Sequence, residues 1–164
     1  MINFFTGTMK SGKSAYLIEK ALGYATKNAK VLYIRPKSDT RDFITRKNIH
    51  FETNKIVFGN EDTSFSGFKV IFIDEIHLFD LDFIKRVIEN KNDKRFFLAG
   101  LTHDLDEKMF DYVGILFKHI SEIKIMTAKC DICHSKNAFY HQRIGQEIVG
   151  DNYRVLCEEC QKIS

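Results

Sequence analysis

The sequence predicts an α/β fold with a parallel β-sheet, followed by a small lobe at the C-terminal end. Short apolar segments of strand type alternate with segments of helical period, an order that builds a parallel sheet with crossover helices. A glycine-rich turn joins the first predicted strand to the first predicted helix. After Ala128 the composition changes to cysteine, histidine and polar residues. We therefore expect two parts, residues 1–127 and residues 128–164.

Length and charge limit the classes of protein that fit. The 164 residues suffice for one main domain with a small appendage, and 44% hydrophobic with 29% charged residues is ordinary for a soluble globular chain. The 25 basic and 22 acidic residues are scattered, so no basic stripe for nucleic acid is visible. The chain shows neither a signal-peptide pattern nor an apolar run of roughly 18 residues. We expect a cytoplasmic protein with no nucleic-acid or membrane partner.

The first strand, beginning at Ile2, is predicted to lead into a phosphate-binding loop of the form G-x-x-x-x-G-K-S. Its residues are Gly7, Thr8, Met9, Lys10, Ser11, Gly12, Lys13 and Ser14. The glycines let the backbone wrap a phosphate, while the loop amides, the helix N-terminus and Lys13 supply positive potential. Ser14 offers a hydroxyl to Mg²⁺. The alternative is a plain Gly/Ser turn between a strand and a helix.

The elements that follow continue the alternation. The predicted helices cover residues 14–28, a segment capped by Asp80, and residues 109–120. The predicted strands are residues 31–34, 55–58, 70–73, 95–99 and 122–127, the last of them half-buried. Between residues 37 and 67 the pattern weakens, and we expect a connection near the nucleotide there. The core should hold about four or five strands.

Two carboxylates follow the apolar strand at residues 70–73. Asp74 and Glu75 should emerge at the sheet edge beside the phosphate loop. There the first can hold Mg²⁺ and its water shell, and the second can act as a base or position a nucleophile. Without the phosphate loop, the same pattern often marks only a solvated strand end.

The four cysteines form two C-x-x-C pairs, Cys130 with Cys133 and Cys157 with Cys160, separated by 23 residues. In a reducing compartment this spacing indicates a structural Zn²⁺ site with four thiolate ligands. His134 is a competing ligand, although four thiolates already satisfy zinc. The alternative is two unrelated pairs of buried or redox-active cysteines.

Further segments complete a longer pattern that runs in order along nearly the whole chain. They are Asp39-Thr40-Arg41, the stretch from Ile73 to Phe79, the stretch from Gly100 to Phe110, and the segments 138–143 and 148–153 between the cysteine pairs. Together with the phosphate loop and the cysteines, they resemble the zinc-containing (type II) thymidine kinase family. The resemblance implies a P-loop NTPase (RecA-like) core with a parallel sheet and a C-terminal zinc lobe with a lasso-type loop.

That resemblance also implies a reaction for deoxynucleoside salvage and DNA synthesis. ATP would donate its γ-phosphoryl group to the 5′-hydroxyl of thymidine, with Glu75 as general base. Lys13 and Arg41 would offset charge on the transferred group. Mg²⁺ would be held by Ser14, Asp74 and, through water, Asp39. The family implies a homotetramer.

The thymine ring would lie among residues at the family's wall and loop positions. By resemblance these are Met9, Leu101, Phe110 and Tyr153 as walls, Ile148 and Gly150 in the closing loop, and His141 near the base. Departures from the family pattern occur at Lys10, His77, Leu78, Leu105 and His141. They leave the phosphoryl-transfer residues intact and bear on the identity of the base. His77 is interpreted as a packed histidine facing the next strand.

Three alternatives remain open. The same chemistry could act on another deoxynucleoside, such as deoxyuridine or a modified pyrimidine. A non-catalytic nucleoside or nucleotide sensor could keep the fold, although Lys13, Ser14, Asp74 and Glu75 are all present. A helicase-like ATPase is suggested by Asp74-Glu75-Ile76-His77, but 164 residues leave no room for its second lobe.

Overall fold

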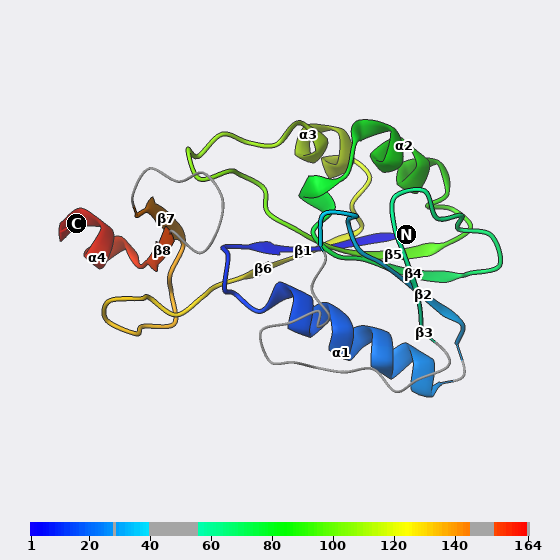
Figure 1. The fold of residues 1–164 in the computed structure, drawn as a ribbon, viewed down its shortest axis with the longest axis horizontal. Helices are drawn as coiled ribbons and strands as arrows, with labels where there is room; N and C mark the ends of the chain where they lie inside the picture. The colour runs from blue at the N-terminus through cyan, green and yellow to red at the C-terminus, as the bar shows by residue number, and fades with distance from the viewer. Residues whose placement is uncertain (28, 40–55, 145–152, 164) are drawn as a thin grey trace.

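The computed structural model describes residues 1–27, 29–39, 56–144 and 153–163. One sheet with helices on both faces forms the body of the molecule, and a smaller lobe that carries the C-terminus lies at one end (Figure 1). This confirms the α/β fold with a C-terminal lobe. Among the described residues, no helix has the length and apolar character needed to cross a membrane.

Within the part of the chain that the structure describes, the sheet has six strands in the order β3-β2-β4-β5-β1-β6, one more than the upper expectation of five. All five neighbouring pairs are parallel, as the crossover pattern predicts. The strands are β1 (Ile2–Gly7), β2 (Val31–Ile34), β3 (Ile56–Gly59), β4 (Val70–Ile73), β5 (Arg95–Ala99) and β6 (Glu122–Met126). The phosphate loop follows β1 and the two carboxylates follow β4, so both leave the sheet at its carboxyl edge.

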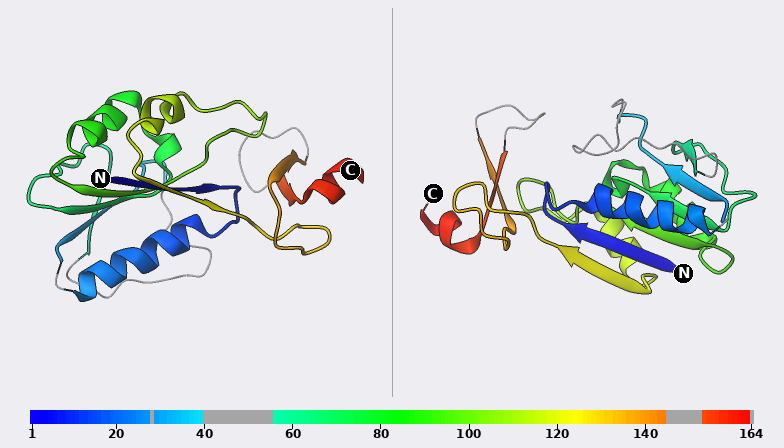
Figure 2. Two further views of the ribbon diagram at one scale, coloured as in Figure 1. Left: turned by 180° about the vertical axis from the view of Figure 1, so that it is seen from behind. Right: turned by 90° about the horizontal axis from the view of Figure 1, so that it is seen from below.

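Helix α1 (Lys13–Thr26) covers one face of the sheet, and α2 (Leu81–Glu89) and α3 (Asp111–Phe117) cover the other (Figures 1 and 2). The apolar stripe of α1 faces the sheet, as its helical spacing predicted, with Leu17, Ile18 and Ala21 fully buried and Leu22 partly buried. It packs in one core cluster with Phe72 and Phe97, whose rings stack with centroids 4.7 Å apart. This packing fixes the start of α1 against the sheet.

The helices on the second face begin at residues that the structure explains. Asp80 caps α2 by accepting a hydrogen bond from the Phe83 amide at 2.7 Å, which confirms the predicted cap. Helix α3 starts at Asp111, later than the predicted 109, because Met109 forms an isolated β-bridge with His103. A short 3₁₀ turn, η1 (Ile76–Leu78), directly follows the carboxylates.

Strand β6 departs from the half-buried strand that its alternation predicted. All but the last of its residues are exposed, and the side chains of Ile123 and Ile125 are 46% and 64% accessible. Lys124, on the opposite face, lies over the Tyr16 ring of α1 with its Nζ 3.8 Å from the centroid. Because β6 is the edge strand, only one of its faces has a neighbour from a described helix.

The lobe pairs two short strands and ends in a helix. Strands β7 (Tyr140–Arg143) and β8 (Tyr153–Leu156) are antiparallel, and α4 (Glu158–Ile163) follows. A bridge between Ala128 and Ala138 closes the entry to the lobe. Its small core includes buried Val155 and Leu156, and Met9 of the phosphate loop packs against it. The lobe therefore contacts the phosphate loop directly.

Candidate active site

The phosphate loop has the backbone that its glycines were expected to provide. Gly7 has φ 137°, and a Cβ there would stand 1.8 Å from the carbonyl oxygen of Met126 on the neighbouring strand. Gly12, at the N-cap of α1, has φ 84°. Both angles disfavour residues with a side chain. The loop can therefore turn tightly against β6 and enter α1 with its first amides unobstructed by a capping side chain.

Lys13 is buried beneath this loop. Its Nζ donates to the carbonyl oxygens of Thr8 at 2.7 Å and Gly7 at 3.1 Å. Burial lowers the pKa of Lys13 to about 8, against the opposing effect of the nearby carboxylates Glu75 and Asp74. A cation held at such a desolvated place is well suited to bind an anion, and the loop amides surround the same space.

Asp74 stands next to Ser14, as the two motifs predicted. Ser14 Oγ donates to Asp74 Oδ1 at 3.1 Å, the Glu75 amide donates to the same oxygen at 3.0 Å, and Tyr33 Oη donates to Oδ2 at 3.1 Å. Burial, and then the neighbouring Glu75, raise the pKa of Asp74 to about 7, although these hydrogen bonds oppose the shift. A buried carboxylate beside a hydroxyl is an oxygen ligand set that fits Mg²⁺.

Glu75 occupies a strained backbone conformation at the end of β4. Its φ of 48° and ψ of 45° place a non-glycine residue in the left-handed region, at the N-cap of η1. Its side chain is 27% accessible. Strain of this kind persists only where the surroundings impose it, and it is typical of functional sites. Here the left-handed conformation of Glu75 accompanies different orientations of the two neighbouring side chains: that of Asp74 is buried, and that of Glu75 remains accessible to solvent.

His77 has a packing role, in agreement with the sequence interpretation. Its Nδ1 accepts from the Leu101 amide at 3.3 Å, and its ring centroid lies 5.3 Å from that of Phe110. Burial and then Lys13 lower the pKa of His77 to about 4, so the ring is neutral at pH 7. His77 Nδ1 lies 3.7 Å from Glu75 Oε2, but the two side chains do not form an ion pair because the imidazole is uncharged.

The structure also places the described members of the predicted base pocket. His141 Nε2 accepts from the Met9 amide at 2.9 Å, and its ring meets Tyr153 edge-on with centroids 6.0 Å apart. Leu101 and Tyr153 are buried, and Phe110 is half-buried. Leu101 follows β5, so the phosphate loop, the sheet edge and the lobe each supply part of this set. The predicted residues Ile148 and Gly150 lie outside the described residues.

A contact that the sequence did not predict joins the phosphate loop to the cysteine-rich segment. Lys10, at φ 62°, forms an ion pair with Asp131 at 2.9 Å, and its Nζ lies 5.0 Å from the Tyr153 ring centroid. Asp131 also accepts from the Val155 amide at 2.8 Å. Lys10 stands where the family pattern has an apolar or small residue, and that departure was the only sequence signal for this contact.

Asp39 lies beside a cation of its own segment. Its carboxylate pairs with Arg35 at 3.0 Å, and the Asp39 side chain is 6% accessible. The predicted Arg41 lies outside the described residues. The water-mediated role of Asp39 at magnesium stays a prediction.

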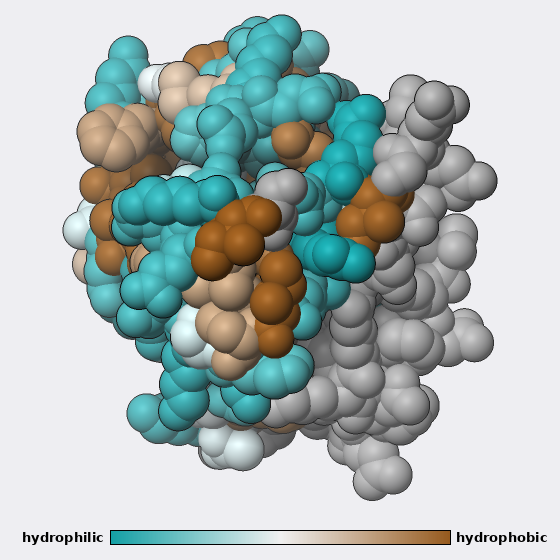
Figure 3. Space-filling model, turned by 90° about the vertical axis from the view of Figure 1, so that its left-hand side faces the viewer, coloured by the Kyte–Doolittle hydropathy of each residue, from teal (hydrophilic) through white to brown (hydrophobic). Residues whose placement is uncertain are grey.

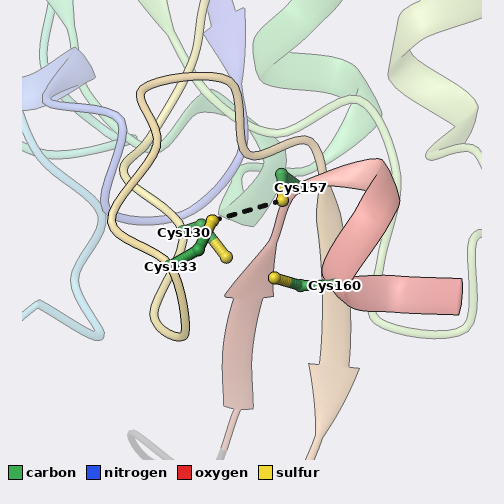
Figure 4. Close-up of side chains that lie close together, drawn as sticks. All are labelled: Cys130, Cys133, Cys157 and Cys160. Atoms are coloured by element: carbon green, nitrogen blue, oxygen red, sulfur yellow. Dashed lines mark hydrogen bonds between the residues drawn. The ribbon is translucent and has the colours of Figure 1, made fainter. Parts of the chain in front are cut away.

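The four cysteines form one cluster, with their sulfur atoms directed toward one another (Figure 4). All four Sγ atoms lie within 4.8 Å of one another. A tetrahedral zinc site with Zn–S bonds near 2.3 Å requires sulfur separations of about 3.8 Å, which this cluster meets with small adjustment. Cys130 and Cys133 come from the segment before β7, Cys157 lies between β8 and α4, and Cys160 belongs to the first turn of α4. The donor set fits structural Zn²⁺.

A cavity of about 480 Å³ adjoins the phosphate loop, between the sheet edge and the lobe. Thr8 and His141 contribute to its wall, and the exposed Ile123, Ile125 and Phe139 make it partly apolar. The end of the molecule that carries the lobe accordingly shows apolar side chains among hydrophilic ones (Figure 3). The volume falls in the range of small-molecule sites.

Comparisons with known proteins agree with this geometry. A family model described as thymidine kinase matches residues 1–161. The chain is 31% identical to a thymidine kinase of Mycoplasma mobile, over 98% of this chain and 86% of that protein. It is 28% identical to one from African swine fever virus, over 98% of this chain and 92% of that protein. The chain is 25% identical to a thymidine kinase of Amsacta moorei entomopoxvirus, over 97% of this chain and 96% of that protein.

The match covers the phosphate loop, the carboxylates after β4 and all four cysteines within one alignment. These are the groups that the fold brings together at the carboxyl edge of the sheet and in the lobe beside it. The chain belongs to the thymidine kinase family.

Proposed function

We propose that this protein transfers the γ-phosphoryl group of ATP to the 5′-hydroxyl of thymidine and releases dTMP and ADP. The observation that carries the proposal is the meeting of Ser14 and Asp74 at 3.1 Å beside the phosphate loop, with the reachable carboxylate of Glu75 next in sequence. The relatives named thymidine kinase support thymidine as the acceptor.

The phosphate loop binds the donor nucleotide. The first amides of α1 and the charge of Lys13 attract the β- and γ-phosphates of ATP. Lys13 then exchanges its contacts with the carbonyl oxygens of Gly7 and Thr8 for phosphate oxygens. Because the transition state for phosphoryl transfer is loose, catalysis depends mainly on positioning and charge neutralisation. Arg41 is assigned the same task by the family pattern.

Ser14 and Asp74 would hold the magnesium ion, with Asp39 acting through water. When bound, the ion neutralises charge on the phosphates and aligns them for transfer. Asp74 is ionised more readily beside a cation, which offsets the effect of its burial. Ser14 and Asp74 are already in hydrogen-bond contact, so little rearrangement of either side chain is required.

Glu75 takes the proton of the 5′-hydroxyl as that oxygen attacks phosphorus. Glu75 lies two residues beyond the last residue of β4, at the sheet edge where the phosphate loop begins. Since His77 is neutral and accepts from the Leu101 amide, it does not neutralise Glu75. A carboxylate within reach of the acceptor hydroxyl suits general base catalysis.

The lobe binds the base and closes over it. We assign residues 1–127 to nucleotide binding and phosphoryl transfer, and residues 128–164 to a zinc-held lobe that clamps the nucleoside. The walls of the base pocket are formed by Met9, Leu101, Phe110, His141 and Tyr153. The closing loop contains Ile148 and Gly150. The proposal includes a cytoplasmic homotetramer, in keeping with the family resemblance.

A coupled assay with ATP and Mg²⁺ tests the acceptor. Thymidine, deoxyuridine, deoxycytidine and the purine deoxynucleosides are compared at equal concentration, and dTMP is identified by mass spectrometry. We expect the highest kcat/KM with thymidine. A higher kcat/KM with another nucleoside would leave the phosphoryl-transfer mechanism in place. It would indicate that His141 and Leu105 adapt the pocket to the base of that nucleoside. Nucleotide binding without turnover of any nucleoside would overturn the proposal in favour of a sensor.

A further inference from the structure

We propose that Tyr33 is a positioning residue for the magnesium carboxylate. Its phenol holds one oxygen of Asp74 so that the other is presented beside Ser14. This inference rests on the proposed function, because that function gives Asp74 its metal. The tyrosine was predicted only as part of a buried strand, and its hydroxyl has no part in the mechanism above.

The carboxylate of Asp74 is divided between two sets of donors. Oδ1 accepts from Ser14 Oγ at 3.1 Å and from the Glu75 amide at 3.0 Å, whereas Oδ2 accepts from Tyr33 Oη at 3.1 Å. An ionised carboxylate only accepts, so the phenol is the donor in the last of these. Tyr33 therefore binds Oδ2 of Asp74, the oxygen that Ser14 does not contact. The phenol does not compete with Ser14 for Oδ1.

Sheet register explains why the phenol reaches this carboxylate. Tyr33 on β2 lies opposite Phe72 on β4 in the parallel ladder. Asp74 is two residues beyond Phe72, and side chains two apart in an extended segment point to the same face. The Asp74 amide continues the ladder by donating to the Ile34 carbonyl at 2.9 Å. A long side chain at position 33 thus extends along the sheet toward Asp74.

Packing keeps the ring in place. Tyr33 has no accessible surface, and its ring lies 5.8 Å from that of Phe58 on β3, centroid to centroid. It belongs to the core cluster that α1 covers, and α1 also carries Ser14. The same packed layer therefore sets the positions of the phenol and of the serine. Asp74, at 1% accessible, has little water available to replace a lost donor.

Tyr33→Phe removes the hydroxyl and keeps the ring, and Tyr24→Phe is the matched control. The Tyr24 hydroxyl accepts from Arg95 at 2.8 Å, on the surface near the amino edge of the sheet. The main readout is the affinity for ADP, measured by calorimetry with and without Mg²⁺. We expect Tyr33→Phe to bind free ADP within about 2-fold of wild type and to lose about 10-fold or more of the affinity gained from Mg²⁺, as one hydrogen bond to a charged group implies.

Kinetics provide a second readout. In Tyr33→Phe the Mg²⁺ concentration for half-maximal turnover should rise, while the KM for thymidine stays unchanged. Tyr33→Leu, an apolar residue of a different shape, should reproduce the loss, and both proteins are checked by thermal melting. An unchanged Mg²⁺ effect in either folded variant overturns the inference, as does an equal loss for free ADP and Mg²⁺–ADP.

The binding readout separates this inference from the proposed function. If the wild type phosphorylates no nucleoside but Tyr33→Phe still loses the Mg²⁺ effect on ADP, the positioning role stands and the kinase proposal fails. If thymidine is phosphorylated and Tyr33→Phe keeps the full Mg²⁺ effect, the kinase proposal stands and the positioning role fails.

Discussion

The imidazole of His141 accepts a hydrogen bond from the backbone amide of Met9, with 2.9 Å between Nε2 and the amide nitrogen. The two residues are 132 positions apart, one in the lobe and one in the phosphate loop. Burial and then Lys13 lower the pKa of His141, which favours the neutral ring that can accept. The phosphate loop is therefore held partly by the segment that we assign to the nucleoside.

His141→Ala should weaken substrate binding because it removes this bond and a wall of the pocket. A lost hydrogen bond of about 0.5–1.5 kcal/mol corresponds to a KM for thymidine raised about 2- to 13-fold. His119→Ala, between α3 and β6 with its Nδ1 2.9 Å from Lys91 Nζ, serves as the control. Steady-state kinetics measure the KM for thymidine in both variants. Equal KM values for both variants and the wild type would show that the hydrogen bond between His141 and Met9 does not contribute to thymidine binding.

Gly7→Ala should destabilise the protein by more than about 2 kcal/mol, since its Cβ would overlap the Met126 carbonyl and its φ is positive. Gly114→Ala is the contrasting variant, because Gly114 is within α3 and a Cβ there meets no atom within 4 Å. It should stabilise the protein by about 0.4–1 kcal/mol. Urea unfolding measures both, and a Gly7→Ala protein as stable as wild type would contradict the tight turn.

The contribution of Asp74 to the stability of the protein without nucleotide and metal should fall as pH rises from about 4 toward 7. His77, whose folded pKa of about 4 lies below its unfolded value near 6.5, should contribute in the opposite sense over most of this range. Asp74 has a folded pKa of about 7, above the unfolded value near 3.9, so the native state binds the extra proton in this window. The contribution is at most about 1.4 kcal/mol for each pH unit. Asp74→Asn should remove the falling contribution, so that its stability rises more steeply with pH than that of the wild type, and Mg²⁺–ADP should oppose the Asp74 contribution. Parallel slopes for wild type and Asp74→Asn would refute the assignment.

Removal of zinc should unfold the lobe while leaving the sheet intact. We expect one zinc ion per chain by elemental analysis and its loss in Cys130→Ser. Amide hydrogen exchange should then accelerate in β7 and β8, and also at Met9, whose amide donates to His141. The exchange of β1 and β5 serves as the internal reference. Zinc-free protein with full protection in β7 and β8 would contradict a structural role for the metal.

The sequence predicted those parts of the site that a few adjacent residues define. The phosphate loop, the carboxylates after β4 and the cysteine pairs each carry their chemistry within a short segment, and the structure brings the first two together as expected. The cap of α2 at Asp80 was predictable for the same reason. In each case local backbone geometry and residue chemistry were sufficient.

Contacts that depend on sheet register or on packing between distant segments were not predictable. Tyr33 read as an ordinary buried residue, because only the pairing of β2 with β4 brings its hydroxyl to Asp74. The exposure of β6 could not be inferred from its alternation, which does not reveal that the strand is at an edge. The ion pair between Lys10 and Asp131 likewise needs the lobe in place.

Glu75 is the central residue of the proposed reaction, and single-turnover kinetics of Glu75→Gln test its role as the base directly. Enzyme in excess, with Mg²⁺–ATP and thymidine, reports the transfer step, while ADP affinity reports the integrity of the phosphate loop. Glu89→Gln, near the end of α2, is the matched control. We predict a transfer rate about 10²- to 10⁴-fold lower in Glu75→Gln with unchanged ADP affinity. A rate within a few-fold of wild type would contradict the assignment of Glu75 as the catalytic base.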